Sequence, residues 1–403
     1  MRQGHGGEAY ELALGLREGH EGEPRFDYLL GGSALDSGHL SEGVFALERL
    51  LRQYPAEDPA RLQLGRGYYL LEQDRRARQE FEQILSHDPE QVLRLSAERF
   101  IKALDRRAGR YRRSLSAWLA AGLGHESNLN AGPESTLFPP YTLPASARAQ
   151  ESPFALAAGG IRFAQPLAPR TQLLLLADLE QREYTDSPLD STRLNLRAGL
   201  DLQRGANDVS LYLQGREQWI DGDAYRRYRG AGIDLHHRLS PATRLSAWLQ
   251  GGEISYPGQP LLDTTLTTLR IGASHQLPGH WSPLLFGSLY AGEEEADLGS
   301  PAALAAAERD LRGARAGVQL APSGAFDLYA VLGYEESRYG APDLLYSVVR
   351  EDELTTLRLG GRWHLDRQWS LRGELLHTDN DSNLRMKAYR GTEASLRVRY
   401  DFR

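Results

Sequence analysis

The sequence contains no cysteine and only two methionines among its 403 residues. The absence of cysteine excludes disulfide scaffolds, zinc sites with cysteine ligands and cysteine nucleophiles. Lysine is nearly absent too, because Lys102 and Lys387 are the only two and arginine carries almost all of the positive charge. The net charge is −7, whereas a general nucleic-acid-binding protein is expected to be basic, so no nucleic-acid partner is predicted.

Long apolar segments are also missing. The mean hydropathy is −0.49, and purely aliphatic runs are short, as at Leu173–Ala177. A membrane-spanning helix needs about 20 consecutive apolar residues, so the sequence excludes a helical membrane protein. A membrane β-barrel remains possible, because its strands alternate between apolar and polar residues and give the mean hydropathy of a soluble protein.

The periodicity of the sequence changes near residue 114. Before this point apolar residues recur at helical spacing in a segment rich in Glu, Arg, Leu and Ala. After it apolar and polar residues alternate, and Gly, Thr, Tyr and Trp become more frequent. Such a change indicates a domain boundary, and it predicts an all-α domain over 1–113 and an all-β domain over 114–403.

The helical part contains a 34-residue repeat with the spacing of tetratricopeptide (TPR) units. The second copy carries Leu64, Gly65, Tyr68, Ala77, Phe81 and Pro89, and the first carries Leu30, Gly31, Ala34, Gly43, Leu47 and Pro55. A closing helix over 91–107 is predicted, with Val92, Leu95, Phe100 and Leu104 facing inward. The concave face would carry Arg25, Tyr28, Arg66 and Tyr69. This face is either a groove for a peptide or protein client, or a spacer that packs on the next domain.

The β part is predicted to contain fourteen strands. The candidates are 114–124, 152–163, 171–182, 191–202, 207–217, 226–236, 243–252, 264–274, 284–292, 309–320, 325–334, 352–364, 369–378 and 390–402. The number is even, and each segment has about the length that a tilted membrane strand needs. In 191–202, for example, Leu194, Leu196 and Leu200 share one face while Arg193 and Arg197 share the other. A soluble β-sandwich alternates in the same way, so alternation alone does not decide between the two folds.

The connections between the strands favour a membrane barrel. They alternate between short turns and longer segments at 125–151, 183–190, 218–225, 253–263, 293–308, 335–351 and 379–389, which is typical of a barrel with periplasmic turns and outer loops. Aromatic residues are also predicted to form two girdles. One lies near the short turns (Phe163, Phe326, Trp363, Trp369, Tyr400, Phe402), and the other near the long loops (Tyr184, Trp219, Tyr256, Tyr290, Tyr334).

The polar faces of the strands are candidates for a pore lining. Among them, Arg193, Arg197, Asp201, Arg397 and Arg399 would either create a field across the lumen or form structural ion pairs that fill it. The acidic runs of the long loops have no calcium-binding spacing, so no metal and no cofactor are predicted. HExxH, GxSxG and P-loop motifs are absent, and the protein is not expected to be an enzyme.

A short motif at the end of the first predicted strand resembles a known family. Residues 122–133 read Gly-Leu-Gly-His-Glu-Ser-Asn-Leu-Asn-Ala-Gly-Pro, which is similar to the start of the barrel in the surface lipoprotein assembly modifiers (Slam). The segment 161–167 before the first short turn, and the order of a short TPR domain and a fourteen-strand barrel, are similar to that family too. The chain departs from the usual barrel terminus because Arg403 follows Phe402.

The resemblance implies an outer-membrane translocator with its helical domain in the periplasm. Its clients would be surface lipoproteins or secreted proteins that capture iron or haem. Outer-membrane lipids, periplasmic chaperones and the barrel assembly machinery would be further partners. The motif residues His125, Glu126, Ser127, Asn128 and Asn130 map to the first outer loop. This loop either folds inward as a plug that gates the pore or is an ordinary ordered loop. The alternatives are a polysaccharide export pore with a TPR adaptor and a porin-like channel.

Overall fold

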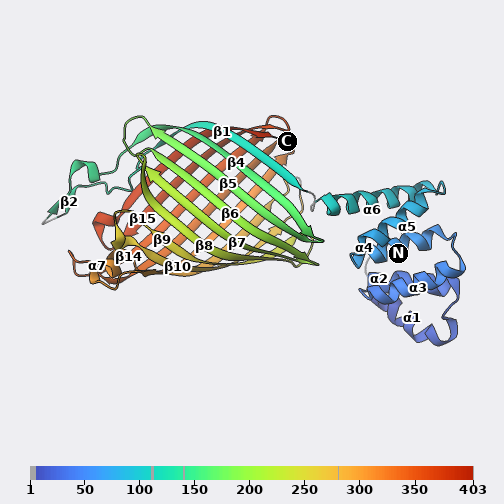
Figure 1. The fold of residues 1–403 in the computed structure, drawn as a ribbon. Coiled ribbons are helices and arrows are strands. Elements are labelled where there is room, and N and C mark those ends of the chain that lie inside the picture. The colour runs from blue at the N-terminus through green and yellow to red at the C-terminus, as the bar shows by residue number, and fades with distance from the viewer. Residues whose placement is uncertain (1–5, 110–112, 139–140, 280, 403) are drawn as a thin grey trace. The chain divides into compact units, whose positions relative to one another are not determined.

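The computed structural model describes residues 6–109, 113–138, 141–279 and 281–402. The chain divides into two compact units, Met1–Arg112 and Arg113–Arg403, which are helical and β-stranded respectively (Figure 1). The division lies next to the point at which the period of the sequence changes.

The helical unit repeats a pair of antiparallel helices. It contains α1 (Gly6–His20), α2 (Pro24–Asp36), α3 (Leu40–Gln53), α4 (Asp58–Leu70), α5 (Asp74–Leu85) and α6 (Gln91–Gly109). From the start of α2 at Pro24 to the start of α4 at Asp58 the chain advances 34 residues, and α3 and α5 have the same offset. The predicted repeat period is therefore confirmed. No helix among the described residues is long and apolar enough to span a bilayer.

Equivalent positions in the two helix pairs make equivalent contacts. A Cβ added to Gly31 would lie 2.5 Å from Leu47, and one added to Gly65 would lie 2.6 Å from Phe81. These glycines let the paired helices approach closely. In α6, Leu104 is buried and Phe100 stacks on Phe81, whereas Val92 is 73% exposed, so the prediction that Val92 and Leu95 face inward is wrong. The inward stripe instead runs through Ala97, Phe100 and Leu104, at helical spacing.

The second unit is a closed barrel of fourteen antiparallel strands, as predicted. The strands are β1 (Ser114–Glu126), β4 (Ser152–Ala168), β5 (Thr171–Tyr184), β6 (Ser191–Arg204), β7 (Asn207–Ile220), β8 (Asp223–Arg238), β9 (Thr243–Ser255), β10 (Thr264–Gln276), β11 (Leu284–Ala296), β12 (Arg309–Ser323), β13 (Phe326–Pro342), β14 (Val349–His364), β15 (Trp369–Ser382) and β16 (Tyr389–Phe402). Each strand pairs with its sequence neighbour, and β1 closes the barrel by pairing Ala117–Glu126 with Glu393–Phe402 of β16. We call this β1–β16 pairing the seam.

The outer loops are shorter than the sequence predicted, because most strands continue past their predicted ends. The segment 218–225, which was predicted to be a long loop, is almost entirely part of two strands. Here β7 and β8 are joined by a tight turn at Asp221 and Gly222, whose φ angles are 50° and 83°. Two positive φ angles define the hairpin turn that Asp-Gly favours, so the chain reverses without a loop. The remaining loops carry β2 (Leu137–Phe138), β3 (Tyr141–Thr142), α7 (Pro301–Ala306) and three short 3-10 turns.

The two faces of the barrel wall differ in polarity. On β6, Leu196 lies on the outer face and is 48% exposed. The next residue, Arg197, lies on the inner face and forms an ion pair with Asp234 of β8. The outer face carries exposed leucines on nearly every strand, and a closed barrel has no unpaired strand edge. An apolar exterior, a polar interior and the absence of an edge are the features of a membrane-spanning barrel.

The aromatic girdle at the short-turn end is present. Tyr400 contacts both Trp369 and Phe402 there, and Phe326 lies beside Trp363. The predicted girdle near the long loops is partly wrong, because Tyr184 and Tyr290 point into the lumen, where their hydroxyls donate hydrogen bonds to Glu126 and Glu335. Both occupy the inward position of the strand alternation, which a count of aromatics near strand ends does not consider.

Candidate functional site in the barrel lumen

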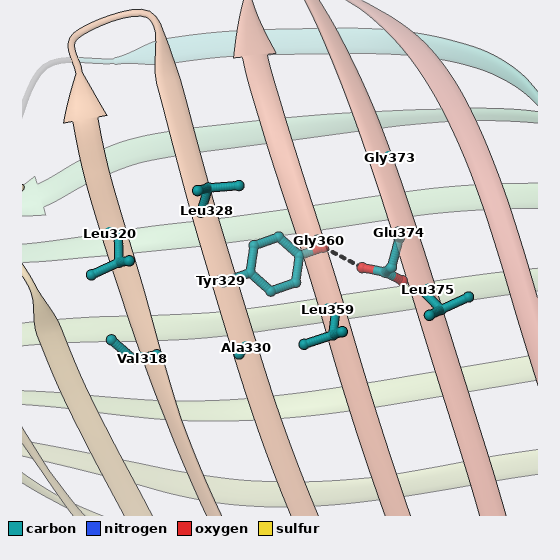
Figure 2. Close-up of a pocket in the computed structure, with 10 residues that line it drawn as sticks. All are labelled: Val318, Leu320, Leu328, Tyr329, Ala330, Leu359, Gly360, Gly373, Glu374 and Leu375. Atoms are coloured by element: carbon teal, nitrogen blue, oxygen red, sulfur yellow. Dashed lines mark hydrogen bonds between the residues drawn. The ribbon is translucent and has the colours of Figure 1, made fainter.

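The inner wall of the barrel is layered, with aromatic rings lying flat on glycines of neighbouring strands. A Cβ added to Gly360 would lie 2.2 Å from Cζ of Tyr329, and one added to Gly313 would lie 2.4 Å from Tyr290. Figure 2 shows Tyr329 of β13 beside Gly360 of β14, with its hydroxyl directed at Glu374 of β15. Packing an aromatic ring over a strand glycine covers backbone that would otherwise face the lumen. The sequence analysis did not identify this pattern.

Arginines form a second layer over these rings. The guanidinium of Arg197 lies 3.5 Å from the ring centre of Tyr212, and that of Arg399 lies 4.4 Å from the ring of Trp118. Stacking on an aromatic face orients the planar guanidinium and adds a cation–π attraction. The predicted lumen residues Arg197 and Arg399 are therefore inside the barrel, each held by a ring.

Carboxylates neutralise most of these arginines. Arg197 pairs with Asp234 at 2.7 Å, and Arg399 pairs with Asp401 at 2.5 Å. Asp201 accepts hydrogen bonds from Ser210 at 2.6 Å and Gln172 at 3.1 Å. Ion pairs along the wall thus account for much of the predicted charge, which favours the structural alternative for these residues.

A larger ionic cluster lies inside the barrel next to the seam. It consists of Glu126, Glu180, Arg182, Glu393 and Arg397, and we call it the seam cluster. Arg182 of β5 is bonded to Glu180 at 2.9 Å and to Glu393 of β16 at 3.1 Å, and Arg397 of β16 is bonded to Glu180 at 2.8 Å. Because β4 and β1 lie between β5 and β16 in the strand order, these side chains cross two strands.

Small and flat residues beneath the seam cluster make this crossing possible. On the inner face of β1, a Cβ added to Gly124 would lie 2.3 Å from the ring of Phe154. The guanidinium of Arg182 then lies 4.8 Å above that ring. Arg193, predicted as a lumen residue, stands opposite Glu180 in the β5–β6 register, so it faces the same region.

The motif at the end of the first strand ties the first outer loop to the seam. His125 and Glu126 were predicted to lie in that loop, but they are the last residues of β1 and extend its ladder. The hydroxyl of Ser127 accepts a hydrogen bond from the backbone N–H of Thr392 on β16 at 2.9 Å. The buried amide of Asn128 donates to the backbone carbonyls of Arg390 and Gly132, both at 2.8 Å. The motif therefore fixes both strands of the seam to one loop.

Asn130 organises the same loop from its other side. Its side chain donates to the carbonyl of Arg148 at 2.9 Å and accepts from the backbone N–H of Gln150 at 3.0 Å. The two alternatives for this loop were an inward plug and an ordinary ordered loop. Figure 1 shows β2 of the loop beyond the barrel rim, which favours the ordered loop. The hydrogen bonds of Asn128 and Asn130 fix the base of the loop and leave its tip outside.

In the helical unit, the four predicted client-binding residues differ in exposure and in their partners. Arg25 is exposed and Tyr28 is half-buried against the helical core. Arg66 is bonded to Asp36 at 2.6 Å. Tyr69 contacts Phe100 of α6, and the guanidinium of Arg107 lies 4.0 Å above its ring. Helix α6 therefore packs against Tyr69, and a role in client binding remains a prediction for all four residues.

The outer surface of the barrel has a shallow groove of about 500 Å³ across β12–β15. Figure 2 shows the leucines around it, among them Leu320, Leu328, Leu359 and Leu375. An apolar groove on the outer face of a membrane barrel accommodates lipid chains. Among the described residues, no three His, Asp or Glu side chains are placed to hold a metal ion.

Comparisons with known proteins give the following matches. No protein-family model matches the chain, and no curated protein matches it. Similar solved structures include OmpT, an outer membrane protein of Vibrio cholerae (9% identity, 72% of this chain and 97% of that chain, TM-score 0.41). They also include the anion-selective porin from Comamonas acidovorans (12% identity, 72% of this chain and 99% of that chain, TM-score 0.39). A third is the outer membrane channel DcaP of Acinetobacter baumannii (10% identity, 72% of this chain and 97% of that chain, TM-score 0.42). At such TM-scores the similarity assigns no function.

Proposed function

We propose that this protein is an outer-membrane translocator that helps client proteins cross to the cell surface. The clients would be surface lipoproteins or secreted iron- or haem-capture proteins, as the resemblance of residues 122–133 to the Slam family implies. The observation that carries the proposal is the direct connection of the helical repeat to the barrel, because α6 ends at Gly109 and β1 begins at Ser114. A channel for small solutes alone does not need such a unit.

The strand order supports a specific orientation. Because the barrel has fourteen strands, β1 begins and β16 ends at the short-turn end. In barrels of this class the short turns are periplasmic and the longer loops are external. The helical unit would therefore lie in the periplasm, where it would receive the client. Periplasmic chaperones and the barrel assembly machinery are the partners expected there.

A porin-like channel is the second candidate, and the arginine layer of the lumen favours it. Guanidinium groups held on rings around a water-filled pore would select for anions. A polysaccharide export pore is less consistent with the lumen, since a sugar track needs uncovered rings. Here Arg197 and Arg399 cover the rings of Tyr212 and Trp118.

The translocator proposal is tested by co-expression with a candidate surface lipoprotein from the same organism. Protease treatment of intact cells should degrade the client only when this protein is present. Equal exposure with and without it would contradict the proposal. A chain lacking residues 1–110 should retain a barrel that shifts its gel mobility on heating but should not deliver the client. Undiminished delivery by that chain would show that the helical unit is only a spacer.

A further inference from the structure

Two nearby arginines of the lumen have no carboxylate partner among the described residues. Arg270 lies on β10 and Arg315 on β12, with β11 between them. In the described part of the chain neither side chain forms a hydrogen bond or an ion pair, and the buried Nε of Arg270 has no acceptor. Leaving a buried N–H without an acceptor costs free energy, so an acceptor from outside the chain would be favoured there.

Arg270 is nevertheless held in one orientation. Its guanidinium lies 5.1 Å from the ring of Trp248 and 5.2 Å from the ring of Tyr290, on the two neighbouring strands. Tyr290 is fixed in turn by its hydrogen bond to Glu335 at 2.7 Å. A guanidinium positioned by two rings loses little conformational entropy when it binds an anion.

Arg315 lies in a region of excess positive charge. The charged side chains close enough to act on it are Arg358 and Arg270, and both are positive. Its register partners, Ser288 on β11 and Gly333 on β13, are small and carry no charge. Arg358 is already bonded to Glu374 at 2.5 Å. The wall therefore does not neutralise the positive charge of Arg315 and Arg270.

These groups surround one cavity on the inner wall. It has a volume of about 230 Å³, and its lining includes Arg270, Tyr290, Arg315, Glu335 and Arg358. A single water occupies roughly 30 Å³ of liquid, so a small oxyanion and several waters fit in this space. Of these lining groups Glu335 alone is an anion, and its carboxylate accepts the Tyr290 hydroxyl.

We propose that this cavity binds an oxyanion group, a phosphate or a carboxylate, between the guanidinium groups of Arg270 and Arg315. Each guanidinium presents a planar fork of N–H donors that matches two oxygens of such a group. The free N–H groups would then have acceptors, and the excess charge of the wall would be compensated. The site would serve a solute in the lumen, and it does not depend on the identity of any protein client.

The test is titration calorimetry of the full chain in detergent micelles at low ionic strength, with inorganic phosphate in one series and acetate in another. Saturable binding of either anion is expected, and the stronger of the two identifies the preferred group. Arg270→Gln and Arg315→Gln should each weaken binding about tenfold or more, because each removes a charged hydrogen-bond donor. Glu335→Gln should strengthen binding, since it removes the negative charge from the cavity.

Arg162→Gln is the matched control. Arg162 is an inward residue of β4, on the opposite side of the strand order, and it stands opposite Ser116 in the β1–β4 register. Its replacement changes the net charge of the lumen equally and should leave binding unchanged. The absence of saturable binding for both anions would overturn the proposal. So would an equal loss in Arg162→Gln, because that result would indicate a diffuse field instead of a site.

Discussion

Replacing Arg182 by methionine should destabilise the barrel strongly. The Arg182 side chain is only 7% exposed and is bonded to Glu180 and Glu393 at 2.9 and 3.1 Å. Methionine retains much of its length but none of its charge, so Glu393 loses its close partner. Breaking a buried ion pair by removing one member typically costs about 3–5 kcal/mol. Because Arg397 remains bonded to Glu180 at 2.8 Å, we expect the free energy of unfolding to fall by the lower end of this range, about 3 kcal/mol.

The matched control is Arg312→Met on the outer side of the wall. Arg312 is also bonded to a glutamate of a neighbouring strand, Glu336, but its side chain is 79% exposed. Exposed ion pairs contribute about 0.2–1 kcal/mol, so this variant should change stability little. The assay is guanidinium-induced unfolding of the full chain in detergent micelles, followed by tryptophan fluorescence and by heat-dependent gel mobility.

A double substitution separates the ion pair from packing. Adding Glu393→Gln to Arg182→Met removes the carboxylate left without its close partner, so part of the lost stability should return. Equal destabilisation by Arg182→Met and Arg312→Met, with no recovery in the double variant, would refute the structural role of the seam cluster.

Three further changes are predicted from close contacts. Gly65→Val should lower the free energy of unfolding of the helical unit by about 1–3 kcal/mol, because the new side chain meets Phe81. The measurement is the unfolding midpoint of the helical circular dichroism signal. Gly360→Val should displace the ring of Tyr329. This overpacking should lower the free energy of unfolding of the barrel by about 1–3 kcal/mol and reduce its unfolding midpoint. Asn128→Ala should expose the first outer loop to proteolysis in intact cells, because the loop base loses its hydrogen bonds to Arg390 of β16 and to Gly132 within the loop.

Controls for these changes use sites with open space. A Cβ on Gly15 would have no atom within 4 Å, so Gly15→Ala should leave the helical signal and its midpoint unchanged. In the barrel, Gly373→Ala on the outer face of β15 meets only Leu396 at 3.9 Å and serves the same purpose. Unchanged stability in Gly65→Val or Gly360→Val, or an Asn128→Ala loop as resistant as the original, would contradict the corresponding contact.

The fold could be predicted from the sequence because its two parts have different periods. The alternation in β6 places Leu196 outside and Arg197 inside, and the sequence shows this without any neighbouring strand. The 34-residue offset likewise identified Gly31 and Gly65 as equivalent positions, and each lies against the facing helix of its pair. Strand ends were less predictable, because β strands continue beyond the membrane as long as their pairing does. The Asp221-Gly222 pair was an available hairpin signal that was not used.

The interior of the barrel was much less predictable. Arg182 and Glu393 are far apart in the chain, and they meet only because closure places β5 within reach of β16. Nothing local in the sequence indicates that Arg270 and Arg315 lack partners, since this depends on which residues three strands bring together. The glycine and aromatic positions of neighbouring strands could have been aligned, but only after the register was known.

The most direct test of the membrane barrel uses the natural absence of cysteine in the chain. Single cysteines can be placed in turn at positions 193–202 of β6 and spin-labelled in lipid vesicles. Each label is then compared for collisions with oxygen, which concentrates in lipid, and with a water-soluble nickel complex. We predict strict alternation, with positions 194, 196, 198, 200 and 202 accessible to oxygen and positions 193, 195, 197, 199 and 201 accessible to nickel. Uniform accessibility along the strand, or exclusion of oxygen from Leu196 and Leu200, would contradict a wall with lipid on one side and a polar lumen on the other.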